Sequence, residues 1–246
     1  MNTMQKRTAI VTGASRGIGK AIAIKYAQMG YDLAICCRKN QPALEKTAQE
    51  IRSYGVSCIS FLGDMGVFSD AEQFFSQILS AFPSIDVLIN NAGISYIGLL
   101  QDMTENEWNQ VISTNLNSVF YCSKLAVKEM LKQKFGKILS ISSIWGNTGA
   151  SMEVAYSASK GGVNAFTKAL AKELAPSRIQ VNAIACGVID TQMNSFLSAE
   201  EKNVLLEEIP AGRMGTCEEV AELAYMVNQK NDYLTGQIIT FDGGFC

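Results

Sequence analysis

The residue types best suited to chemistry in this chain are Tyr156 and Lys160, which lie four positions apart in a stretch with a helical pattern. Side chains at this spacing project from the same face of a helix. An ammonium beside a phenol favours the phenolate, so we expect Lys160 to lower the pKa of Tyr156 from its usual value of about 10. A tyrosine tuned in this way can exchange a proton with a carbonyl or alcohol oxygen.

A third candidate is Ser143, thirteen residues before Tyr156. Its neutral hydroxyl can hold the same substrate oxygen while negative charge develops there. The chain contains no His, which excludes a Ser–His mechanism and a His-ligated metal site. The Tyr–Lys spacing alone also fits a surface tyrosine beside a solvated lysine, so the assignment needs support from elsewhere in the chain.

That support comes from a glycine-rich turn between an apolar run at 7–12 and a helical stretch that begins at Lys20. Gly13 permits a tight turn, Gly17 lets the backbone approach a pyrophosphate, and Gly19 lets helix and strand pack closely. The N-terminus of the helix then offers free N–H groups to phosphates. In this strand–turn–helix context the G-x-x-x-G-x-G spacing predicts a dinucleotide site.

The choice of dinucleotide depends on the end of the next strand, which we expect over 31–37. An NAD site commonly ends this strand with Asp or Glu, which binds the ribose 2′-hydroxyl. Here Arg38 and Lys39 follow Cys37, and a nearly doubly charged 2′-phosphate suits a planar guanidinium. Arg16 could approach the same phosphate. Arg38 and Lys39 could instead decorate a loop, but we predict NADPH/NADP+ as the cofactor.

Short strands rich in β-branched residues alternate with helical stretches along all 246 residues. This alternation predicts an α/β, Rossmann-type, doubly wound fold with a seven-stranded parallel sheet and helices on both faces. We expect one domain, with residues 1–95 mainly binding the dinucleotide and 96–246 carrying catalysis and substrate. The expected strands are 7–12, 31–37, 57–62, 86–90, 137–141, 178–184 and 237–241, and the expected helices are 41–54, 69–82, 104–133, 154–175 and 217–229, besides the one from Lys20.

Composition argues against several classes of partner. The formal charge of −2 and the scattered basic residues give no patch for nucleic acid or anionic membrane. No apolar run reaches the length of a membrane span, and the polar start does not resemble a signal peptide. Seven Cys without paired metal-ligand spacing fit free thiols in a reducing compartment. We expect a cytoplasmic protein without a metal site.

Together these motifs resemble the short-chain dehydrogenase/reductase superfamily over nearly the whole chain. The matching segments are 12–19, Asp64, 90–93, Asn115, 142–143, Tyr156 with Lys160, and Gly187-x-Ile189-x-Thr191. The resemblance implies that Tyr156 is the general acid in reduction and that Ser143 polarises the carbonyl. It implies that Lys160 binds the nicotinamide ribose and that Asn115 kinks its helix and holds a water linking Lys160 to solvent.

The resemblance also implies the cofactor contacts. Asp64 and Met65 would meet the adenine, 91–93 would line the adenosine side, and Ile189 and Thr191 would receive the carboxamide. Structural roles stay open for Asn90 and Asn91 as a strand–loop link, for Thr191 as a helix cap and for Asp64 in a turn. The full expected set is Gly13, Ser15, Arg16, Gly17, Ile18, Gly19, Arg38, Asp64, Met65, Asn91, Ala92, Gly93, Tyr156, Lys160, Ile189 and Thr191.

The chain departs from the family pattern at Cys186, where a Pro commonly precedes Gly187. Losing Pro frees a backbone torsion and places a thiol beside the nicotinamide pocket. We expect cofactor binding to survive, and we hypothesise that Cys186 makes the protein sensitive to alkylating agents. By resemblance alone, a homotetramer is expected through the long fourth and fifth helices and the C-terminal strand.

Two segments, 12–19 and 115–120, resemble the 3-oxoacyl-[acyl-carrier-protein] reductases of fatty acid biosynthesis. Those enzymes dock an acidic carrier with basic residues near the active-site entrance. Basic residues that could serve here, or could simply complement a helix dipole, are Lys132, Lys134, Lys137 and Arg178. A lid is expected at about 190–210, and its apolar residues, which fit ordinary packing as well as a substrate wall, are Phe196, Leu197, Val204, Leu205 and Leu206.

A narrower resemblance, over 142–146 and 149–154, is to reductases that act on 5-aminopentanone-modified elongation factor P. Glu153, just before Tyr156, suits a substrate with an ammonium and is awkward for an anionic carrier. Trp145 could form an apolar or cation–π wall. Alternatively, Glu153 could point to solvent and Trp145 could pack in the core.

We therefore predict NADPH-dependent reduction of a ketone, of the 3-oxoacyl type, with the aminopentanone reductase as a close alternative. The expected substrate contacts are Ser143, Trp145, Glu153 and Tyr156. A hydroxysteroid or other secondary-alcohol dehydrogenase remains open, because one scaffold accepts many ketones. A nucleotide-sensing regulator that has lost catalysis is a further alternative, but the intact Ser143, Tyr156 and Lys160 argue against it.

Overall fold

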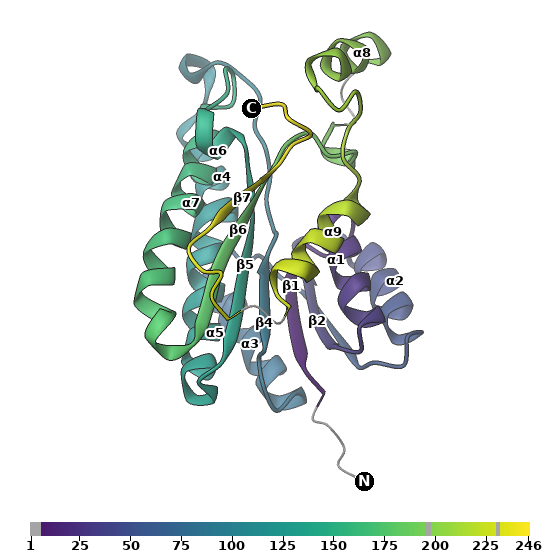
Figure 1. The fold of residues 1–246 in the computed structure, drawn as a ribbon, viewed down its shortest axis with the longest axis vertical. Coiled ribbons are helices and arrows are strands. Elements are labelled where there is room, and N and C mark those ends of the chain that lie inside the picture. Colours follow the sequence, from purple (N-terminus) through teal and green to yellow (C-terminus); the bar gives the residue numbers. More distant parts are fainter. Residues whose placement is uncertain (1–5, 195–197, 230–231) are drawn as a thin grey trace.

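The structure of the chain is a computed structural model that describes residues 6–194, 198–229 and 232–246. Its described residues form one parallel sheet in the order β3-β2-β1-β4-β5-β6-β7, which confirms the predicted fold class (Figure 1). The strands are β1 Thr8–Thr12, β2 Asp32–Cys37, β3 Cys58–Leu62, β4 Val87–Asn90, β5 Gly136–Ser143, β6 Ile179–Cys186 and β7 Ile238–Phe241.

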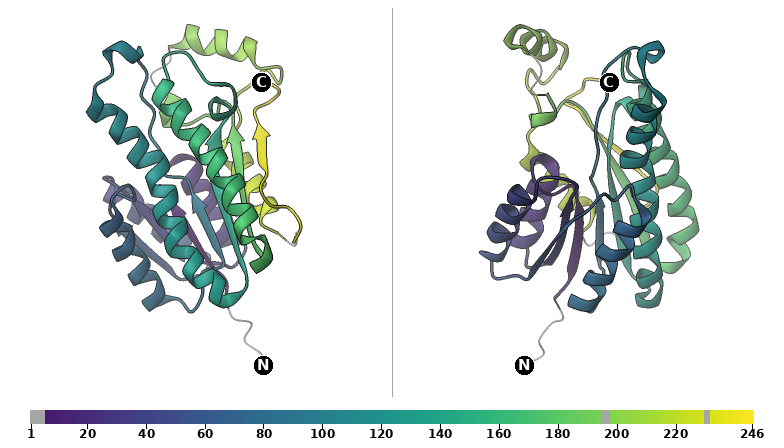
Figure 2. Two further views of the ribbon diagram at one scale, coloured as in Figure 1. Left: turned by 90° about the vertical axis from the view of Figure 1, so that its left-hand side faces the viewer. Right: turned by 180° about the vertical axis from the view of Figure 1, so that it is seen from behind.

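Two layers of helices cover the sheet. The helices are α1 Gly17–Gln28, α2 Gln41–Arg52, α3 Phe68–Ala81, α4 Glu105–Ile112, α5 Ser118–Gln133, α6 Trp145–Thr148, α7 Val154–Leu174, α8 Ala199–Glu208 and α9 Cys217–Val227. Apolar residues of α1, α2 and α9 pack on one face, and those of α3, α5 and α7 pack on the other. Figure 2 shows these layers on opposite sides of the sheet.

Both faces of the central strands are buried, which explains their continuous apolar sequences. In β1, Ala9 and Val11 belong to the core beneath α1, whereas Ile10 belongs to the core beneath α3 and α5. Burying a side chain as large as Ile contributes about 1.5–3 kcal/mol. The two cores therefore hold the sheet rigidly between its helices. The loops that follow the strands are attached to this rigid sheet.

The helix predicted over 104–133 is interrupted. Thr104 and Glu107 form a capping box that starts α4, and a π turn at Ser113–Asn117 separates α4 from α5. Such turns are local insertions that often mark functional sites. Strands β5 and β6 each run two residues beyond their predicted ends, to Ser143 and Cys186.

All carboxyl ends of the strands lie at one edge of this parallel sheet. The strand order reverses between β1 and β4, and crevices at such switch points are the usual ligand sites of these folds. Helix α8 projects beyond this edge (Figure 1). Among the described residues, no helix has both the length and the apolar character needed to cross a membrane.

Candidate active site

The structure brings Tyr156, Lys160 and Ser143 together at the carboxyl edge. Tyr156 and Lys160 lie one turn apart on α7, and Ser143 is the last residue of β5. The Tyr156 hydroxyl is hydrogen-bonded to Ser143. The Nζ atom of Lys160 lies 5.6 Å from the centroid of the Tyr156 ring and donates to the carbonyl oxygen of Ile141 at 2.8 Å. The arrangement places a proton donor, a hydrogen-bonding hydroxyl and an ammonium around one point.

The predicted lowering of the Tyr156 pKa is wrong for this structure. Burial raises the pKa of the Tyr156 phenol well above its usual range because the phenolate would lose its hydration, and this exceeds the opposing effect of the Ser143 hydrogen bond. The Glu153 carboxylate adds to the rise. Burial lowers the pKa of Lys160 to about 8, although the Cys186 side chain opposes this shift. Tyr156 is therefore held as a neutral phenol beside an ammonium that is close to titrating.

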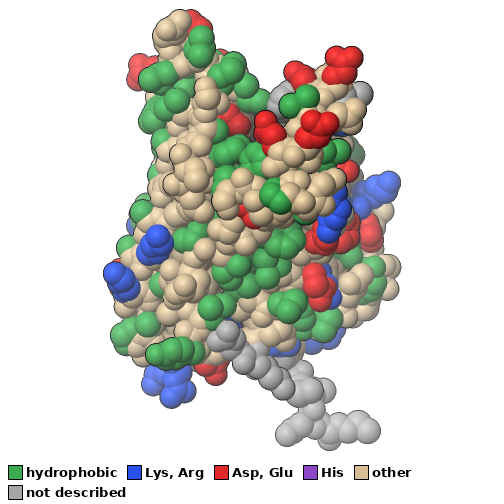
Figure 3. Space-filling view, turned by 45° about the horizontal axis from the view of Figure 1, so that its top comes forward, with side chains coloured by type: hydrophobic (Ala, Val, Ile, Leu, Met, Phe, Trp, Pro, Cys, Tyr) green, Lys and Arg blue, Asp and Glu red, His purple; other side chains and the backbone are tan. Residues whose placement is uncertain are grey.

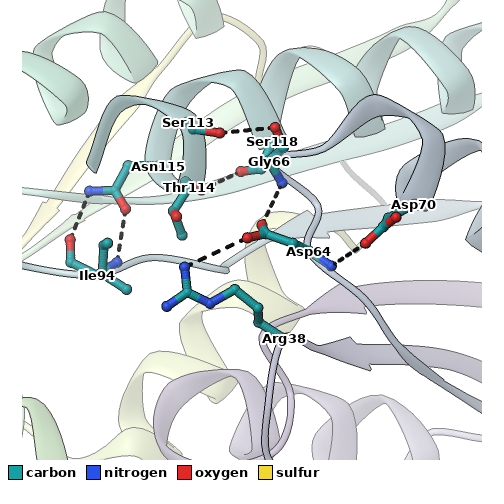
Figure 4. A network of polar contacts seen from close by, with 9 residues as sticks. All are labelled: Arg38, Asp64, Gly66, Asp70, Ile94, Ser113, Thr114, Asn115 and Ser118. Atoms are coloured by element: carbon teal, nitrogen blue, oxygen red, sulfur yellow. Dashed lines mark hydrogen bonds and ion pairs between the residues drawn. The ribbon is translucent and has the colours of Figure 1, made fainter. Parts of the chain in front are cut away.

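Asn115 lies in the π turn, and its side chain ties this turn to two neighbouring elements. Its Oδ1 accepts from the N–H of Ile94 at 2.8 Å, and its Nδ2 donates to the Ile94 carbonyl at 2.9 Å (Figure 4). The same Nδ2 donates to Ser159 Oγ at 3.0 Å, and Ser159 donates to the carbonyl of Tyr156 at 2.7 Å. Asn115 thus links the loop after β4 to the start of α7. The water expected at Asn115 stays a prediction.

A second set of polar contacts, centred on Asn164, joins the end of β5 and the short helix α6 to α7, and Asn164 was not among the predicted site residues. Ser142 Oγ donates to Asn164 Oδ1 at 2.6 Å, and Asn164 Nδ2 donates to Asn147 Oδ1 at 2.8 Å. A Cβ on Gly146 would lie 2.7 Å from the carbonyl carbon of Lys160, so only Gly lets α6 approach α7 this closely. Asn164 lies four residues after Lys160, on the same helix face, and that spacing is the signal by which it could have been found.

The glycine turn after β1 fits a dinucleotide. Gly13 and Gly17 have φ values of +67° and +56°, which favour Gly. A Cβ on Gly13 would lie 2.9 Å from Cα of Ala92, and one on Gly19 would collide with the Asn91 amide. Helix α1 begins at Gly17 with no side-chain cap among the described residues, so its first N–H groups are available to a phosphate.

Other members of the expected cofactor set also lie around this turn. Ser15 is partly buried within the turn, and Ile18 packs against the core beneath α1. Asn91 holds the strand ends together, because its Nδ2 donates to the carbonyls of Thr12 and Gly13 at 2.9 and 3.1 Å. The strand–loop link that the sequence left open for Asn91 is therefore present.

On the catalytic side, Gly93 approaches Lys160 closely. A Cβ built on Gly93 would lie 3.6 Å from the Nζ of Lys160 and 3.5 Å from Oδ1 of Asn115. The loop 91–93 therefore runs directly from the glycine turn to the ammonium. This continuity suits a ligand that spans both regions, as a dinucleotide does.

The segment 189–192 faces the glycine turn from the other side. Ile189 is buried and pairs with Gly215, and Thr191 Oγ1 accepts from the N–H of Met193 at 3.3 Å, so Thr191 also caps the short turn that follows. A Cβ on Gly17 would lie 3.8 Å from Thr191 Cγ2. Arg16 Nη1 donates to Gln192 Oε1 at 3.0 Å. Of the expected lid, Phe196 and Leu197 lie outside the described residues, and Val204, Leu205 and Leu206 lie on α8.

Arg38 and Asp64, expected at different parts of the adenosine, are paired with each other. Arg38 Nη1 lies 3.6 Å from Asp64 Oδ2, and Asp64 Oδ1 accepts from the N–H of Gly66 at 2.9 Å (Figure 4). Asp64 is therefore a turn residue as well as a candidate adenine contact. Met65 beside it is buried.

Glu153 and Trp145, the two candidate substrate residues after Ser143, each contact other residues of the chain. Glu153 Oε2 accepts from Ser95 Oγ at 2.7 Å, so this partly buried carboxylate is held in place near Tyr156. The half-buried Trp145 ring packs edge-on against Phe245, with centroids 5.8 Å apart. The backbone N–H of Trp145 donates to Ser143 Oγ at 3.2 Å.

The basic residues expected near the entrance lie at the opposite edge of the sheet. Lys132 and Lys134 are at the end of α5, Lys137 is the second residue of β5, and Arg178 immediately precedes β6. Because a strand rises about 3.3 Å per residue, Lys137 is roughly 20 Å from Ser143 along β5. Lys137 is also buried. The expectation that these residues dock a carrier at the active site is wrong, because the topology places them at the amino ends of the strands.

Cys186 ends β6 and pairs in register with Ser143. It is buried, and burial raises the pKa of its thiol to about 12 despite the nearby Lys160. Since the thiolate is the reactive form, the structure argues against the hypothesis that Cys186 is sensitive to alkylating agents.

Figure 3 shows the molecule with the carboxyl edge turned forward. The lobe formed by α8 carries acidic side chains, and a hollow separates it from the opposite lobe. The exposed carboxylates of α8 are Glu200, Glu201, Glu207 and Glu208. In the part of the chain that the structure describes, no group of three or more His, Cys, Asp or Glu residues could hold a metal ion.

Comparison with known proteins identifies relatives of similar length. Residues 7–202 match the family model described as short chain dehydrogenase. The 3-oxoacyl-[acyl-carrier-protein] reductase FabG of Staphylococcus aureus is 39% identical over 239 residues, covering 97% of both chains. The uncharacterized oxidoreductase YmfI of Bacillus subtilis is 37% identical and covers 97% of this chain and 98% of its own. The crystal structure of YwfH, an NADPH-dependent reductase involved in bacilysin biosynthesis, superposes with a TM-score of 0.93 at 29% identity and covers 98% of this chain and 99% of its own.

Proposed function

Because this chain belongs to the short-chain dehydrogenase family, we propose that it is an oxidoreductase that reduces a ketone to a secondary alcohol with NADPH. The observation that carries the proposal is the hydrogen bond between Tyr156 and Ser143, with the Lys160 ammonium beside the Tyr156 ring. When bound, NADPH supplies the hydride for the carbonyl carbon. The protein residues must then hold the carbonyl oxygen and deliver a proton to it.

Ser143 and Tyr156 both present hydroxyl groups where a carbonyl oxygen can accept two hydrogen bonds. Donors placed where charge develops stabilise the transition state. The raised pKa of Tyr156 keeps its proton in place at neutral pH, which is the state that a general acid requires. After Tyr156 gives up this proton, the Lys160 ammonium stabilises the phenolate. Return of the proton to Tyr156 from solvent through Lys160 and the water expected at Asn115 is part of the proposal.

The cofactor assignment is supported by this chain's own residues. The glycine turn and the start of α1 would hold the pyrophosphate, Lys160 would hold the nicotinamide ribose, and Arg38 would meet the 2′-phosphate. YwfH is described as NADPH-dependent, and Arg38 stands where an NAD site commonly has a carboxylate.

For the substrate we propose a 3-oxoacyl thioester, the class named for the relatives in Staphylococcus aureus and Chlamydia muridarum, the latter 40% identical over 240 residues. The thioester would be presented on acyl carrier protein. We also propose a homotetramer, which the exposed Phe120 and Leu131 on α5 support as apolar surface available for contact.

A second candidate is a ketone that bears an ammonium, such as the 5-aminopentanone group on elongation factor P. The observation that favours it is Glu153, which Ser95 holds at 2.7 Å beside Tyr156. The acidic face of α8 and the remote position of the expected basic residues add to it, because an acidic carrier would meet like charge at the entrance. The two candidates differ in the sign of charge near the carbonyl.

The decisive experiment measures NADPH oxidation by the purified protein with a short 3-oxoacyl thioester and with an amino ketone, each beside NADH. Tyr156→Phe is the control, and we expect it to lower kcat by about 10²–10⁴-fold while nucleotide binding is retained. Turnover of the thioester supports the first candidate, and turnover of the amino ketone alone supports the second. Equal rates in wild type and Tyr156→Phe, or no turnover of any ketone despite NADPH binding, would overturn the proposed function.

A further inference from the structure

The ion pair between Arg38 and Asp64 joins two residues that both face the expected adenosine end of the cofactor site. Their closest side-chain atoms are 3.6 Å apart, and the side chains are 29% and 28% exposed. Arg38 directly follows β2, and Asp64 lies just after the adjacent strand β3 (Figure 4). The guanidinium offered to a 2′-phosphate is therefore already beside a carboxylate that remains open to solvent.

Asp64 is anchored more firmly than Arg38. Its Oδ1 accepts from Gly66 N–H at 2.9 Å, and its own N–H donates to Asp70 Oδ2 at 2.9 Å. Gly66 in turn contacts the π turn, where Ser113 Oγ donates to the Gly66 carbonyl at 2.9 Å. A Cβ on Gly66 would lie only 2.6 Å from that Oγ. The loop at 64–66 is thus held against the π turn. Arg38 has the long side chain and is the partner that can move.

Two other cations near Arg38, Arg16 and Lys39, are less suited to bind the 2′-phosphate. Arg16 donates to Gln192 across the crevice, so its side chain is directed toward the opposite segment. Lys39 is exposed and next to Arg38 in sequence. A lysine offers a point charge rather than the planar fork of donors that matches a phosphate. The carboxylate that pairs with Arg38 among the described residues is that of Asp64.

We propose that Asp64 is a specificity-determining residue whose carboxylate competes with the cofactor's 2′-phosphate for Arg38 and so limits the preference for NADPH over NADH. The proposal rests on the proposed function only in taking NADPH as the cofactor. A 2′-phosphate must either draw Arg38 away from Asp64 or share it, and in both cases the anchored carboxylate repels the phosphate. An NAD ribose carries no such charge and does not meet this competition.

Replacing Asp64 by Asn tests the charge alone. The Asn side chain keeps an oxygen that can accept from Gly66 N–H, so the loop retains its anchor. Partly exposed ion pairs contribute little because solvent screens them. Because Asp64 is also a candidate adenine contact, its replacement can change the Kd of both nucleotides equally, so the preference is the quantity to compare. We expect the ratio of the Kd for NAD+ to the Kd for NADP+ to rise by about three- to tenfold in Asp64→Asn.

The experiment is isothermal titration of the full protein, without any ketone, using NADP+, NAD+, adenosine 2′,5′-bisphosphate and 5′-AMP. The variants are wild type, Asp64→Asn, Arg38→Ala and the double variant. Asp70→Asn is the matched control, because it removes a neighbouring carboxylate that bonds to Asp64 but makes no ion pair with Arg38 among the described residues. Asp64→Ser provides a second removal of the charge if the Asn variant has a lowered thermal midpoint. Each titration is repeated at high salt.

The proposal is supported if Asp64→Asn favours each 2′-phosphorylated ligand over its partner without that phosphate, and if this gain in preference disappears on the Arg38→Ala background and shrinks in salt. An unchanged or lowered preference for NADP+ over NAD+ in Asp64→Asn would overturn it, as would an equal gain in Asp70→Asn or a gain that survives without Arg38. Binding needs no substrate, so a failure to reduce ketones would overturn the proposed function without changing these isotherms.

Discussion

The ammonium of Lys160 donates a hydrogen bond to the carbonyl oxygen of Ile141 at 2.8 Å. This bond directs the ammonium to the backbone of β5, and the charge acts on Tyr156 from beside its ring. Lys160 is buried, with its pKa lowered to about 8 by the loss of hydration. The ammonium that must stabilise a Tyr156 phenolate is therefore itself easy to deprotonate.

The pH dependence of reduction follows from this lowered pKa. We expect kcat to be constant near neutral pH and to fall about tenfold per unit well above pH 8, as Lys160 loses its proton while Tyr156, with its raised pKa, stays protonated. The free energy of unfolding is expected to rise over the pH range in which kcat falls. The folded pKa of Lys160 lies below its unfolded value of 10.5, so the cost of burying the charge is present below pH 8 and is relieved as the pH rises toward 10.5.

A pH–rate profile with saturating cofactor and substrate checks this prediction. The control is the pH dependence of nucleotide binding in Tyr156→Phe, which separates the titration of Lys160 from loss of the proton donor. A profile that stays flat to pH 9.5 would show that Lys160 does not titrate in the catalytic range.

The support that Asn115 gives to the site leads to a second prediction. Asn115 is 1% exposed and makes three hydrogen bonds, two to Ile94 and one to Ser159. Asn115→Ala leaves these buried groups without partners, and a typical bond contributes about 0.5–1.5 kcal/mol. We expect a loss of about 2–4 kcal/mol in the free energy of unfolding and a lower kcat, because the start of α7 is no longer held.

Urea unfolding and steady-state kinetics measure both effects. Asn109→Ala is the matched control, since Asn109 is exposed on the neighbouring helix α4, and it should change the free energy of unfolding by less than about 0.5 kcal/mol. If Asn115→Ala is no less stable than this control, the contacts with Ile94 and Ser159 do not hold the site together.

Local sequence patterns predict more of this molecule than contacts between distant residues do. The apolar runs of the strands are local patterns, and they predicted the strand bounds to within two residues. The helices were predicted less well, because α1 begins three residues before Lys20 and the π turn interrupts the helix expected over 104–133. The predicted shift in the pKa of Tyr156 had the wrong sign, because the burial that raises this pKa is a property of the packed fold. The basic residues Lys132 and Lys134 were assigned to the wrong edge because sequence distance does not reveal which end of a parallel strand faces the crevice.

Ion pairs and hydrogen bonds between residues far apart in the sequence were also not predicted. Arg38 and Asp64 were assigned separate contacts with the cofactor, yet they meet because β2 and β3 are adjacent and end at the same edge. The bond between Ser95 and Glu153 joins positions 58 residues apart. Such contacts depend on loop conformation, for which a single sequence carries no periodic signal.

Cys186 gives a third prediction, on chemical reactivity. Burial raises the pKa of this thiol to about 12, whereas Cys246 is exposed at the carboxyl end of the chain. Because only the thiolate reacts quickly, iodoacetamide at pH 7.5 should modify Cys246 first and leave activity nearly unchanged. Mass spectrometry of labelled peptides, followed over the time course of activity, checks the order. Rapid inactivation that Cys186→Ala abolishes would contradict the assignment of Cys186 as an inert, buried thiol.

Glu153 gives the fourth prediction, because it controls charge beside the reacting carbonyl. Its carboxylate is fixed by Ser95 at 2.7 Å and raises the pKa of Tyr156. In Glu153→Gln the amide oxygen can still accept from Ser95, but the negative charge is gone. We expect kcat/KM to fall about 10-fold or more for an amino ketone, as for loss of a charge-assisted contact, and to stay equal or rise for a 3-oxoacyl thioester.

The two substrates must be compared in the same variant, because a general loss of activity would say nothing about charge. Ser95→Ala is the companion variant, since it keeps the carboxylate but releases it, and it should weaken amino-ketone turnover less than Glu153→Gln does. An uncharged ketone of the same length separates the ammonium from the chain that carries it. If Glu153→Gln lowers kcat/KM equally for all three ketones, Glu153 supports the fold around Tyr156 and does not select the substrate by charge.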